Sequence, residues 1–272
     1  MGNGQLTIDE WLEGKPGDLT LGQAFELFES VYMAQRNLSA GTRREYKTDI
    51  RQLRDFLAKY NLTKAANIQL GHLQAFLADG ERRGFDATTR YRKCYSIKAF
   101  FGFLASNKLT LADPAKRLIP PRRPYKQPHP LTPQQTQALL RACSDDPRAS
   151  AIIQLILQTG LRLSEIARLT TYNVELPAEI NDETSGALYV RKGRKEERFS
   201  LDYKACRALH TWLFIRPNID HPALFITKFQ KPMRPRGFQR VIEKYAKLAG
   251  IPKASPRTLR QTYDVQRLQS TG

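Results

Sequence analysis

Apolar residues recur at helical spacing over most of the first 117 positions of the chain. In residues 42–60 they fall at intervals of four, three and four: Tyr46, Ile50, Leu53 and Leu57. Thr42, followed three positions later by Glu45, is typical of a capping box that begins a helix. Similar spacing predicts three further helices, at residues 21–33, 68–82 and 87–106. The first part of the chain is therefore expected to form a four-helix domain.

The pattern changes after residue 130, where helical segments surround two short stretches with strand character. Residues 187–191 and 198–201 are joined by a polar turn at residues 192–197, which predicts an antiparallel β-hairpin. Thr132 is expected to cap the first helix of this part, ahead of Pro133. Helices are expected at residues 134–142, 149–158, 164–170, 203–214, 236–249 and 259–268. The fold class is thus mainly α, with an α+β second domain.

A proline-rich segment separates the two parts. Residues 118–130 contain five prolines in thirteen positions, which disfavours helix and predicts an extended, semi-rigid linker. We therefore divide the chain into an N-terminal tail (1–19), a first domain (20–117), the linker (118–130) and a second domain (131–272).

Charge is the strongest signal in the composition. Forty-four Lys and Arg residues against 26 Asp and Glu residues give a net charge of +18, and the excess is spread over both domains. This balance predicts a polyanionic partner, with nucleic acid the first choice. No stretch has the ~20 apolar residues that cross a bilayer, so a membrane role is not expected. The three cysteines have no metal-ligand spacing and indicate reduced thiols in a cytoplasmic protein.

Two predicted helices carry a basic stripe beside an apolar one. In residues 42–60 the stripe has intervals of three, four and three: Arg44, Lys47, Arg51 and Arg54. In residues 87–106, Arg92 and Lys93 share a polar face with Thr89 and Ser96, while another face is apolar: Cys94, Ile97, Phe101 and Leu104. Each stripe alone fits a solvated surface. Together, in a chain of this charge, they predict contacts with DNA phosphates.

A candidate phosphate clamp follows the helix at 149–158. A Thr-Gly turn leads to Arg162, at the start of the next predicted helix. The planar guanidinium binds two phosphate oxygens, and nearby helix N–H groups favour the same anion. The alternative is an ordinary exposed arginine. Glu165 is expected to orient a neighbour or cap the helix.

The hairpin turn is unusually basic, with Lys192, Arg194 and Lys195 in four positions. Phosphoryl transfer needs cations on the non-bridging oxygens, an acid for the leaving oxygen and a nucleophile in line. Lys192 fits the acid, because a flexible ammonium group can reach into a groove and deliver a proton. Lys195 is the alternative acid. Arg194 and Lys195 are otherwise expected to contact DNA.

Two strings resemble the arginine motifs of the tyrosine recombinases, or phage integrase family. Residues 159–170, Thr-Gly-Leu-Arg-Leu-Ser-Glu-Ile-Ala-Arg-Leu-Thr, are similar to the first motif. Residues 255–263, Ser-Pro-Arg-Thr-Leu-Arg-Gln-Thr-Tyr, are similar to the second, a His-x-Leu-Arg-His-Thr-aromatic pattern in which Arg260 matches the clamp arginine. Residues 38–46 and 113–115 resemble the family's SAM-like core-binding domain.

The resemblance implies a C-shaped clamp of two domains around double-stranded DNA. Two arginines would hold the scissile phosphate, a lysine would act on the leaving oxygen, and a tyrosine would form a 3′-phosphotyrosyl bond. No metal or other cofactor is implied. Family members work as tetramers on two duplexes, so self-association on DNA is expected.

Departures from the pattern bear on catalysis. Arg257 stands where the family has a histidine, and it is either a substitute phosphate donor or a neutral change; Gln261 replaces a second histidine. Only twelve residues follow Arg260, so the catalytic domain is expected to be incomplete, with the nucleophile beyond Gly272. Tyr263 is expected to pack in the core. These residues would then bind DNA without cutting it; the alternative is a non-catalytic remnant or regulator that occupies recombinase sites.

Overall fold

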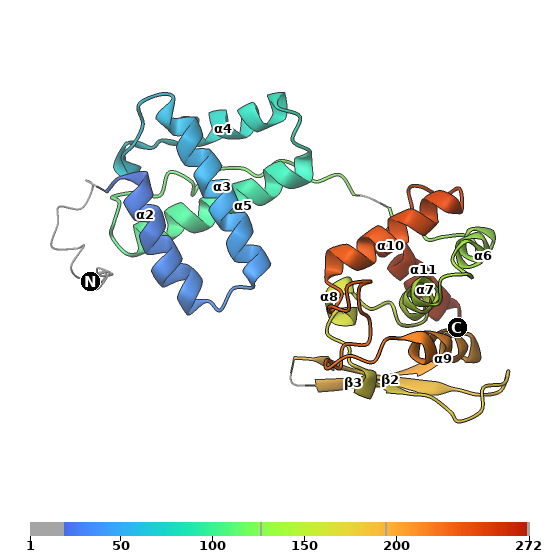
Figure 1. Ribbon diagram of the computed structural model, residues 1–272. Helices are drawn as coiled ribbons and strands as arrows, with labels where there is room; N and C mark the ends of the chain where they lie inside the picture. Colours follow the sequence, from blue (N-terminus) through green and yellow to red (C-terminus); the bar gives the residue numbers. More distant parts are fainter. Residues whose placement is uncertain (1–18, 126, 194, 271–272) are drawn as a thin grey trace. The chain divides into compact units, whose positions relative to one another are not determined.

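The computed structural model describes residues 19–125, 127–193 and 195–270, coloured along the chain in Figure 1. The chain divides into two compact units, residues 1–126 and 127–272. The division falls inside the proline-rich segment, whose described residues form neither helix nor strand. Most of the predicted tail and Arg194 of the hairpin turn lie outside the described residues.

Helices are the main secondary structure of the first unit's described residues, as expected, apart from an isolated β-bridge between Thr20 and Lys64. Its elements are α2 (Leu21–Leu27), the π-helix η1 (Phe28–Met33), α3 (Ala40–Ala58), the 3-10 helix η2 (Ala65–Asn67), α4 (Leu70–Arg82) and α5 (Ala87–Ser106). The helix predicted at residues 21–33 thus changes to π geometry halfway. Helix α5 has the predicted bounds, and Asp86 caps it by accepting the N–H of Thr89 at 2.7 Å.

Helix α3 begins earlier than predicted. Ser39 is its N-cap and accepts the backbone N–H of Thr42 at 3.1 Å, while the two hydroxyls are 2.9 Å apart. The capping box predicted from Thr42 to Glu45 is therefore wrong. Thr42 lies inside the first turn of the helix, and Glu45 is free to make a different contact.

Aromatic side chains fill the core of the first unit. Phe28 is fully buried; its ring stacks on Tyr32 with centroids 4.5 Å apart and meets Phe100 edge-on at 5.5 Å. The apolar face predicted for α5 is confirmed, because all four of its residues are fully buried: Cys94, Ile97, Phe101 and Leu104.

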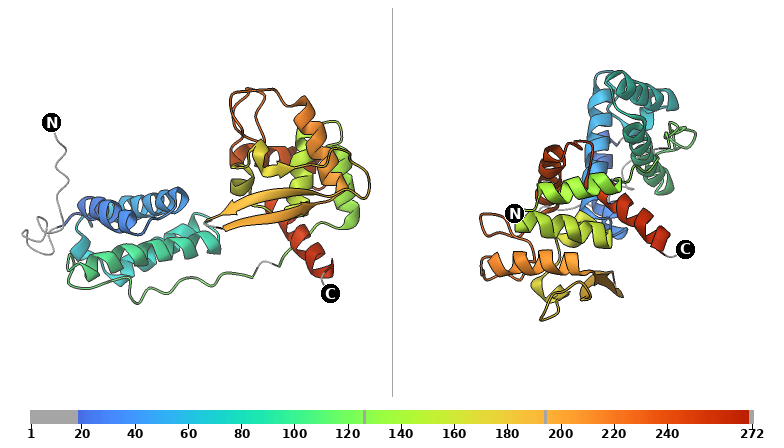
Figure 2. Two further views of the ribbon diagram at one scale, coloured as in Figure 1. Left: turned by 90° about the horizontal axis from the view of Figure 1, so that it is seen from below. Right: turned by 90° about the vertical axis from the view of Figure 1, so that its right-hand side faces the viewer.

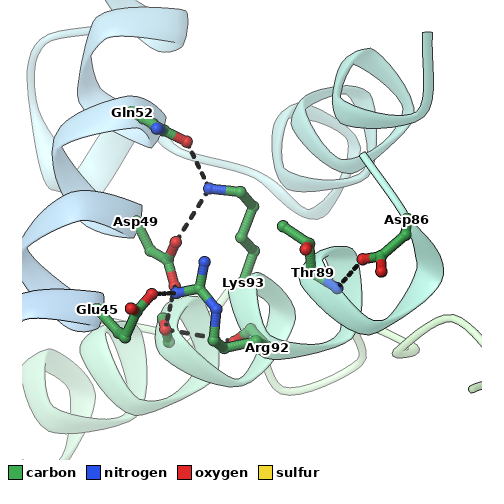
Figure 3. Close-up of polar contacts among 8 residues, drawn as sticks. Glu45, Asp49, Gln52, Asp86, Thr89, Arg92 and Lys93 are labelled. Atoms are coloured by element: carbon green, nitrogen blue, oxygen red, sulfur yellow. Dashed lines mark hydrogen bonds and ion pairs between the residues drawn. The ribbon is translucent and has the colours of Figure 1, made fainter. Parts of the chain in front are cut away.

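A buried ionic cluster joins α3 to α5 (Figure 3). Asp49 is fully buried, and its Oδ1 accepts the ammonium of Lys93 at 2.9 Å. Lys93 is 2% exposed and also donates to the side chain of Gln52. The hydroxyl of Ser96 donates to Oδ2 of Asp49 at 2.7 Å. The expectation that Lys93 contacts DNA is therefore wrong, because Asp49 holds its charge inside the domain.

The second unit is the predicted α+β domain. Its helices are α6 (Pro133–Ala142), α7 (Pro147–Thr159), α8 (Leu163–Ile166), the 3-10 helix η3 (Thr171–Asn173), α9 (Tyr203–Ile215), α10 (Pro235–Leu248) and α11 (Pro256–Ser270). Three antiparallel strands form one sheet in the order β1 (Val174–Glu175), β2 (Gly186–Lys192) and β3 (Lys195–Leu201). The sheet packs against α9 along one side of the unit (Figure 2).

Helix α7 is the centre of the second core and contacts α6, α9, α10 and α11. Four of its large aliphatic residues are fully buried: Ile152, Ile153, Leu155 and Ile156. The helix predicted at residues 164–170 is only the single turn α8. It ends early because the carbonyl of Leu169 accepts the N–H of Leu224 at 2.8 Å, in a pairing with a distant segment.

We expect Lys93→Met to lower the free energy of unfolding by about 3 kcal/mol, because it leaves the buried carboxylate of Asp49 short of a cation. Urea denaturation measures this change. Lys47→Met is the matched control on α3: Lys47 pairs with Glu29 at the surface, so its loss should cost at most about 1 kcal/mol. Equal losses from the two variants would contradict the structural role of Lys93.

Candidate phosphate-binding site

A glycine turn presents Arg162 at the surface. Gly160 ends α7 with a φ of 60°, and its N–H donates to the carbonyl of Ile156 at 2.9 Å. Leu161 is buried, and Arg162 follows in extended conformation as the N-cap of α8. Its side chain is 65% exposed. The turn after the buried end of α7 thus places the guanidinium of Arg162 in solvent.

Glu165 fixes the backbone and the side chain of Arg162. One carboxylate oxygen accepts the backbone N–H of Arg162 at 2.6 Å, and the other is 3.3 Å from its guanidinium. The expectation that Glu165 caps the helix and orients a neighbour is confirmed. Since α8 is a single turn, it adds little helix dipole to the site. The attraction for an anion comes mainly from the guanidinium itself.

The second arginine string forms the first turns of α11. The hydroxyl of Ser255 accepts the N–H of Thr258 at 3.2 Å, directly before Pro256 starts the helix. Arg257 is exposed and Arg260, almost one turn later, is partly buried. Both cations therefore lie near the N-terminal end of a fifteen-residue helix.

Two polar residues of the same string anchor the start of the second unit. Thr262 is buried and its hydroxyl accepts the N–H of Leu131 at 2.8 Å, while Gln261 accepts the N–H of His129 at 3.1 Å. Sequence reasoning gave neither residue this role. The only available signal was their position inside the string, because the partners lie about 130 residues away.

Tyr263 joins the two arginine strings. A Cβ atom placed on Gly160 would lie 2.3 Å from Cδ1 of Tyr263, so the tyrosine ring rests directly on the glycine backbone. Gly160 precedes Arg162 by two residues, and Tyr263 follows Arg260 by three. Since α7 and α11 also pack together, the structure brings the two arginine-bearing segments side by side.

Lys192 lies at the end of β2, opposite Lys195 in the hairpin register. Its ammonium is 2.7 Å from Oε2 of Glu197 and 5.0 Å from the centroid of the Phe199 ring. Among the described residues, no contact joins Lys192 to Arg162 or to Arg260. Its convergence with the arginines stays a prediction.

The basic residues of the first unit differ in their surroundings. Arg44 and Arg51 are exposed on α3. Arg54 pairs with Asp55 at 3.1 Å, and Arg92 pairs with Glu45 at 2.6 Å and with Asp49. Five cations of the first unit therefore remain accessible candidates for phosphate contact: Arg44, Lys47, Arg51, Arg54 and Arg92.

Other site chemistry is sparse in the described part of the chain. It contains no group of three or more His, Cys, Asp or Glu residues placed to hold a metal ion. The three cysteines are free and buried, and burial raises the pKa of the Cys143 thiol to about 11. Within the same described ranges, no helix has the length and apolar character to cross a bilayer.

The two units correspond to two known domains. Residues 129–269 match the phage integrase family, and residues 25–108 match the N-terminal SAM-like domain of phage integrases. The chain therefore belongs to the phage integrase family, the tyrosine recombinases. The resemblance inferred from the arginine strings is confirmed.

Curated relatives and solved structures agree with this assignment. Tyrosine recombinase XerC of Roseiflexus castenholzii is 27% identical over 262 residues, 92% of this chain and 82% of that protein. XerC of Vibrio campbellii is 27% identical over 260 residues, 93% of this chain and 81% of the relative. The fold resembles a λ integrase dimer bound to a COC′ core site (TM-score 0.71, 13% identity, 96% of this chain and 73% of that one). It also resembles XerH recombinase bound to its difH substrate (TM-score 0.68, 18% identity, 91% and 73%).

We expect Gly160→Ala to lower the free energy of unfolding by about 2–5 kcal/mol. Positive φ costs a side chain about 1–2 kcal/mol, and the clash with Tyr263 adds about 1–3 kcal/mol of overpacking. Gly250→Ala is the control, since Gly250 also has positive φ (75°) but open space at its Cβ position. This variant should lose only the about 1–2 kcal/mol that positive φ costs. Urea denaturation that gave both variants the same loss would contradict the Tyr263 contact.

Proposed function

We propose that this protein acts in site-specific recombination of duplex DNA, by phosphoryl transfer of the tyrosine recombinase type through a 3′-phosphotyrosyl intermediate. The observation that carries the proposal is the packing of Tyr263 on Gly160, which puts the two arginine strings next to each other. Two guanidinium groups on adjoining segments can bind the non-bridging oxygens of one phosphate. Membership in the family supports the same reaction.

The roles of the site residues follow from their chemistry. Arg162 and Arg260 hold the scissile phosphate and neutralise the charge that develops on it. Lys192 protonates the leaving oxygen; in the free protein its ammonium pairs with Glu197, and DNA would replace that partner. Arg257 serves as a fixed donor in place of a histidine and cannot accept a proton. Lys195 remains the alternative to Lys192 as the acid, and neither role needs a metal ion.

We further propose that both units contact the duplex. Arg44 and Arg51 on α3 bind phosphates without losing an ion pair in the described structure. Lys47 and Arg54 exchange their surface carboxylates for phosphates at little cost, because exposed pairs contribute about 0–1 kcal/mol. Around the hairpin, Lys195 and Arg194 would add further phosphate contacts, although Arg194 lies outside the described residues.

Self-association on DNA is part of the proposal. The structurally similar λ integrase has been solved as a dimer on a core site and as a tetramer bound to a Holliday junction. A chain of the same fold that holds one scissile phosphate needs partners to exchange strands between duplexes. We place this assembly on DNA in the cytoplasm.

Tyr263 is not the nucleophile in this proposal. Its ring is committed to the contact with Gly160, and a nucleophilic oxygen must be free to approach the phosphorus in line. Packing explains why an aromatic residue stands at this position. The two arginine strings contain no other tyrosine, so the site residues assigned above include no nucleophile, and we expect them to hold the phosphate without cutting the strand.

We expect duplex binding by the 272-residue chain to weaken with salt, with a log–log slope of about −0.9 for each phosphate neutralised. Arg162→Ala and Arg260→Ala should each make this slope shallower by about 0.9, the value of one phosphate contact. Each should also weaken binding about tenfold, as loss of a charge-assisted contact does. Fluorescence anisotropy with a labelled duplex measures both quantities. Arg207→Ala removes an exposed arginine of α9 and is the control. Equal effects from all three variants would contradict the assignment of Arg162 and Arg260 to the phosphate-binding site.

We expect no covalent protein–DNA adduct from these 272 residues on a nicked suicide substrate, and Tyr263→Phe should bind the substrate as the parent chain does. Denaturing gel electrophoresis detects the adduct. An adduct that disappears in Tyr263→Phe would make Tyr263 the nucleophile and overturn its packing role. An adduct that persists in that variant would place the nucleophile at a different tyrosine.

A further inference from the structure

A groove lies between the start of α3 and α5 in the first unit. Its volume is about 510 Å³, and polar and aromatic side chains line it, among them Tyr91, Tyr95, Arg92 and Arg123. The guanidinium of Arg123 lies over the Tyr91 ring, 4.9 Å from its centroid. Glu45 is the one carboxylate among the residues that line the groove.

Arg92 is held between two carboxylates that differ in their exposure. The same nitrogen, Nη1, contacts Oε2 of Glu45 at 2.6 Å and Oδ2 of Asp49 (Figure 3). The side chain of Asp49 is fully buried, whereas that of Glu45 is 51% exposed. Arg92 therefore has an inner carboxylate toward the core and an outer one toward solvent.

The inner carboxylate is fixed by three partners. Asp49 accepts from Lys93, Ser96 and Arg92, and a buried carboxylate with this many donors is costly to disturb. Asp49 thus sets the position of Arg92 in the groove. The pairing is part of the fold and is expected to persist when a ligand binds.

The outer carboxylate is held much more weakly. Glu45 has Arg92 as its ion-pair partner among the described residues, and an exposed pair contributes about 0–1 kcal/mol. A phosphate oxygen carries the same charge as a carboxylate oxygen and accepts the same hydrogen bond. Glu45 thus occupies the place on Arg92 that an incoming phosphate would take.

We propose that Glu45 is an internal substitute for a DNA phosphate: it occupies the outer side of Arg92 in the free protein and is displaced by a backbone phosphodiester of duplex DNA. The inference rests on the proposed function and adds a regulatory element to it. Asp49 is a positioning residue that keeps Arg92 in place during the exchange. Breaking the Glu45–Arg92 pair costs free energy, so Glu45 lowers the affinity of the free protein for every duplex that binds Arg92.

The two carboxylates on Arg92 should therefore affect DNA binding differently. Removing the outer one, with Glu45→Gln, should tighten binding to a random-sequence 30-base-pair duplex about two- to fivefold at low salt, the range of an exposed ion pair. The gain should shrink as salt rises, because salt screens the pair that DNA must break. Fluorescence anisotropy measures the affinity at each salt concentration.

A double-mutant cycle with Arg92→Gln separates exchange from simple repulsion between Glu45 and DNA. If Glu45 acts by occupying Arg92, the gain from Glu45→Gln disappears in the Arg92→Gln background. A gain of the same size in both backgrounds, or weaker binding by Glu45→Gln, would overturn the proposal. Arg92→Gln leaves Asp49 its contacts with Lys93 and Ser96, and thermal unfolding of each variant checks that the fold is kept.

Glu26→Gln provides the matched control for net charge, because Glu26 is an exposed residue of α2 and makes no ion pair in the described contacts. It should give less than a twofold change. If the parent chain showed no salt-dependent duplex binding at all, the proposed function would fail. If the parent chain bound duplex DNA with the expected salt dependence but the double-mutant cycle showed no coupling between Glu45 and Arg92, only the proposed role of Glu45 would be wrong.

Discussion

The ring of Tyr263 resting on the backbone of Gly160 is the contact on which the candidate site depends. Gly160 ends α7 with positive φ and leaves the space that the ring fills. Arg162 and Arg260 lie within three residues of the two ends of this contact. For both guanidinium groups to bind one phosphate, as proposed, a rigid scaffold must hold these like charges near each other before the anion arrives. Donors that are already in place need no reorganisation when charge develops on the phosphate.

The same helix that supplies Arg260 also holds the start of its own unit. Thr262 and Gln261 bind the backbone at Leu131 and His129, where the proline-rich segment ends. A shift of α11 would therefore disturb the beginning of the second unit as well as the arginine. This anchoring gives Gln261 and Thr262 a structural role within the second arginine string. Replacing a histidine by Gln261 is compatible with that role, since an amide oxygen accepts the N–H of His129.

Local patterns predicted those parts of the fold that local interactions determine. The bounds of α5 could be read from its apolar period, and the exposed position of Arg162 from its Thr-Gly turn. The start of α3 was misjudged because Ser39 and Thr42 are both good caps, and the earlier one lengthens the helix. Helix α8 is short because residues around Leu169 pair with a segment some fifty positions away. The hydrophobic pattern of one segment does not show that it will pair with a distant one.

The adjacent residues Arg92 and Lys93 show why a count of basic residues does not locate a DNA-binding surface. They have the same charge, yet Lys93 is buried and Arg92 is partly exposed. The difference comes from Asp49, more than forty positions earlier, which accepts both cations from inside the domain. Lys93 thus contributes to stability, whereas Arg92 keeps one side toward solvent. A basic side chain becomes a DNA ligand only if its carboxylate partners leave it accessible, and that depends on contacts between helices that the sequence of one helix does not contain.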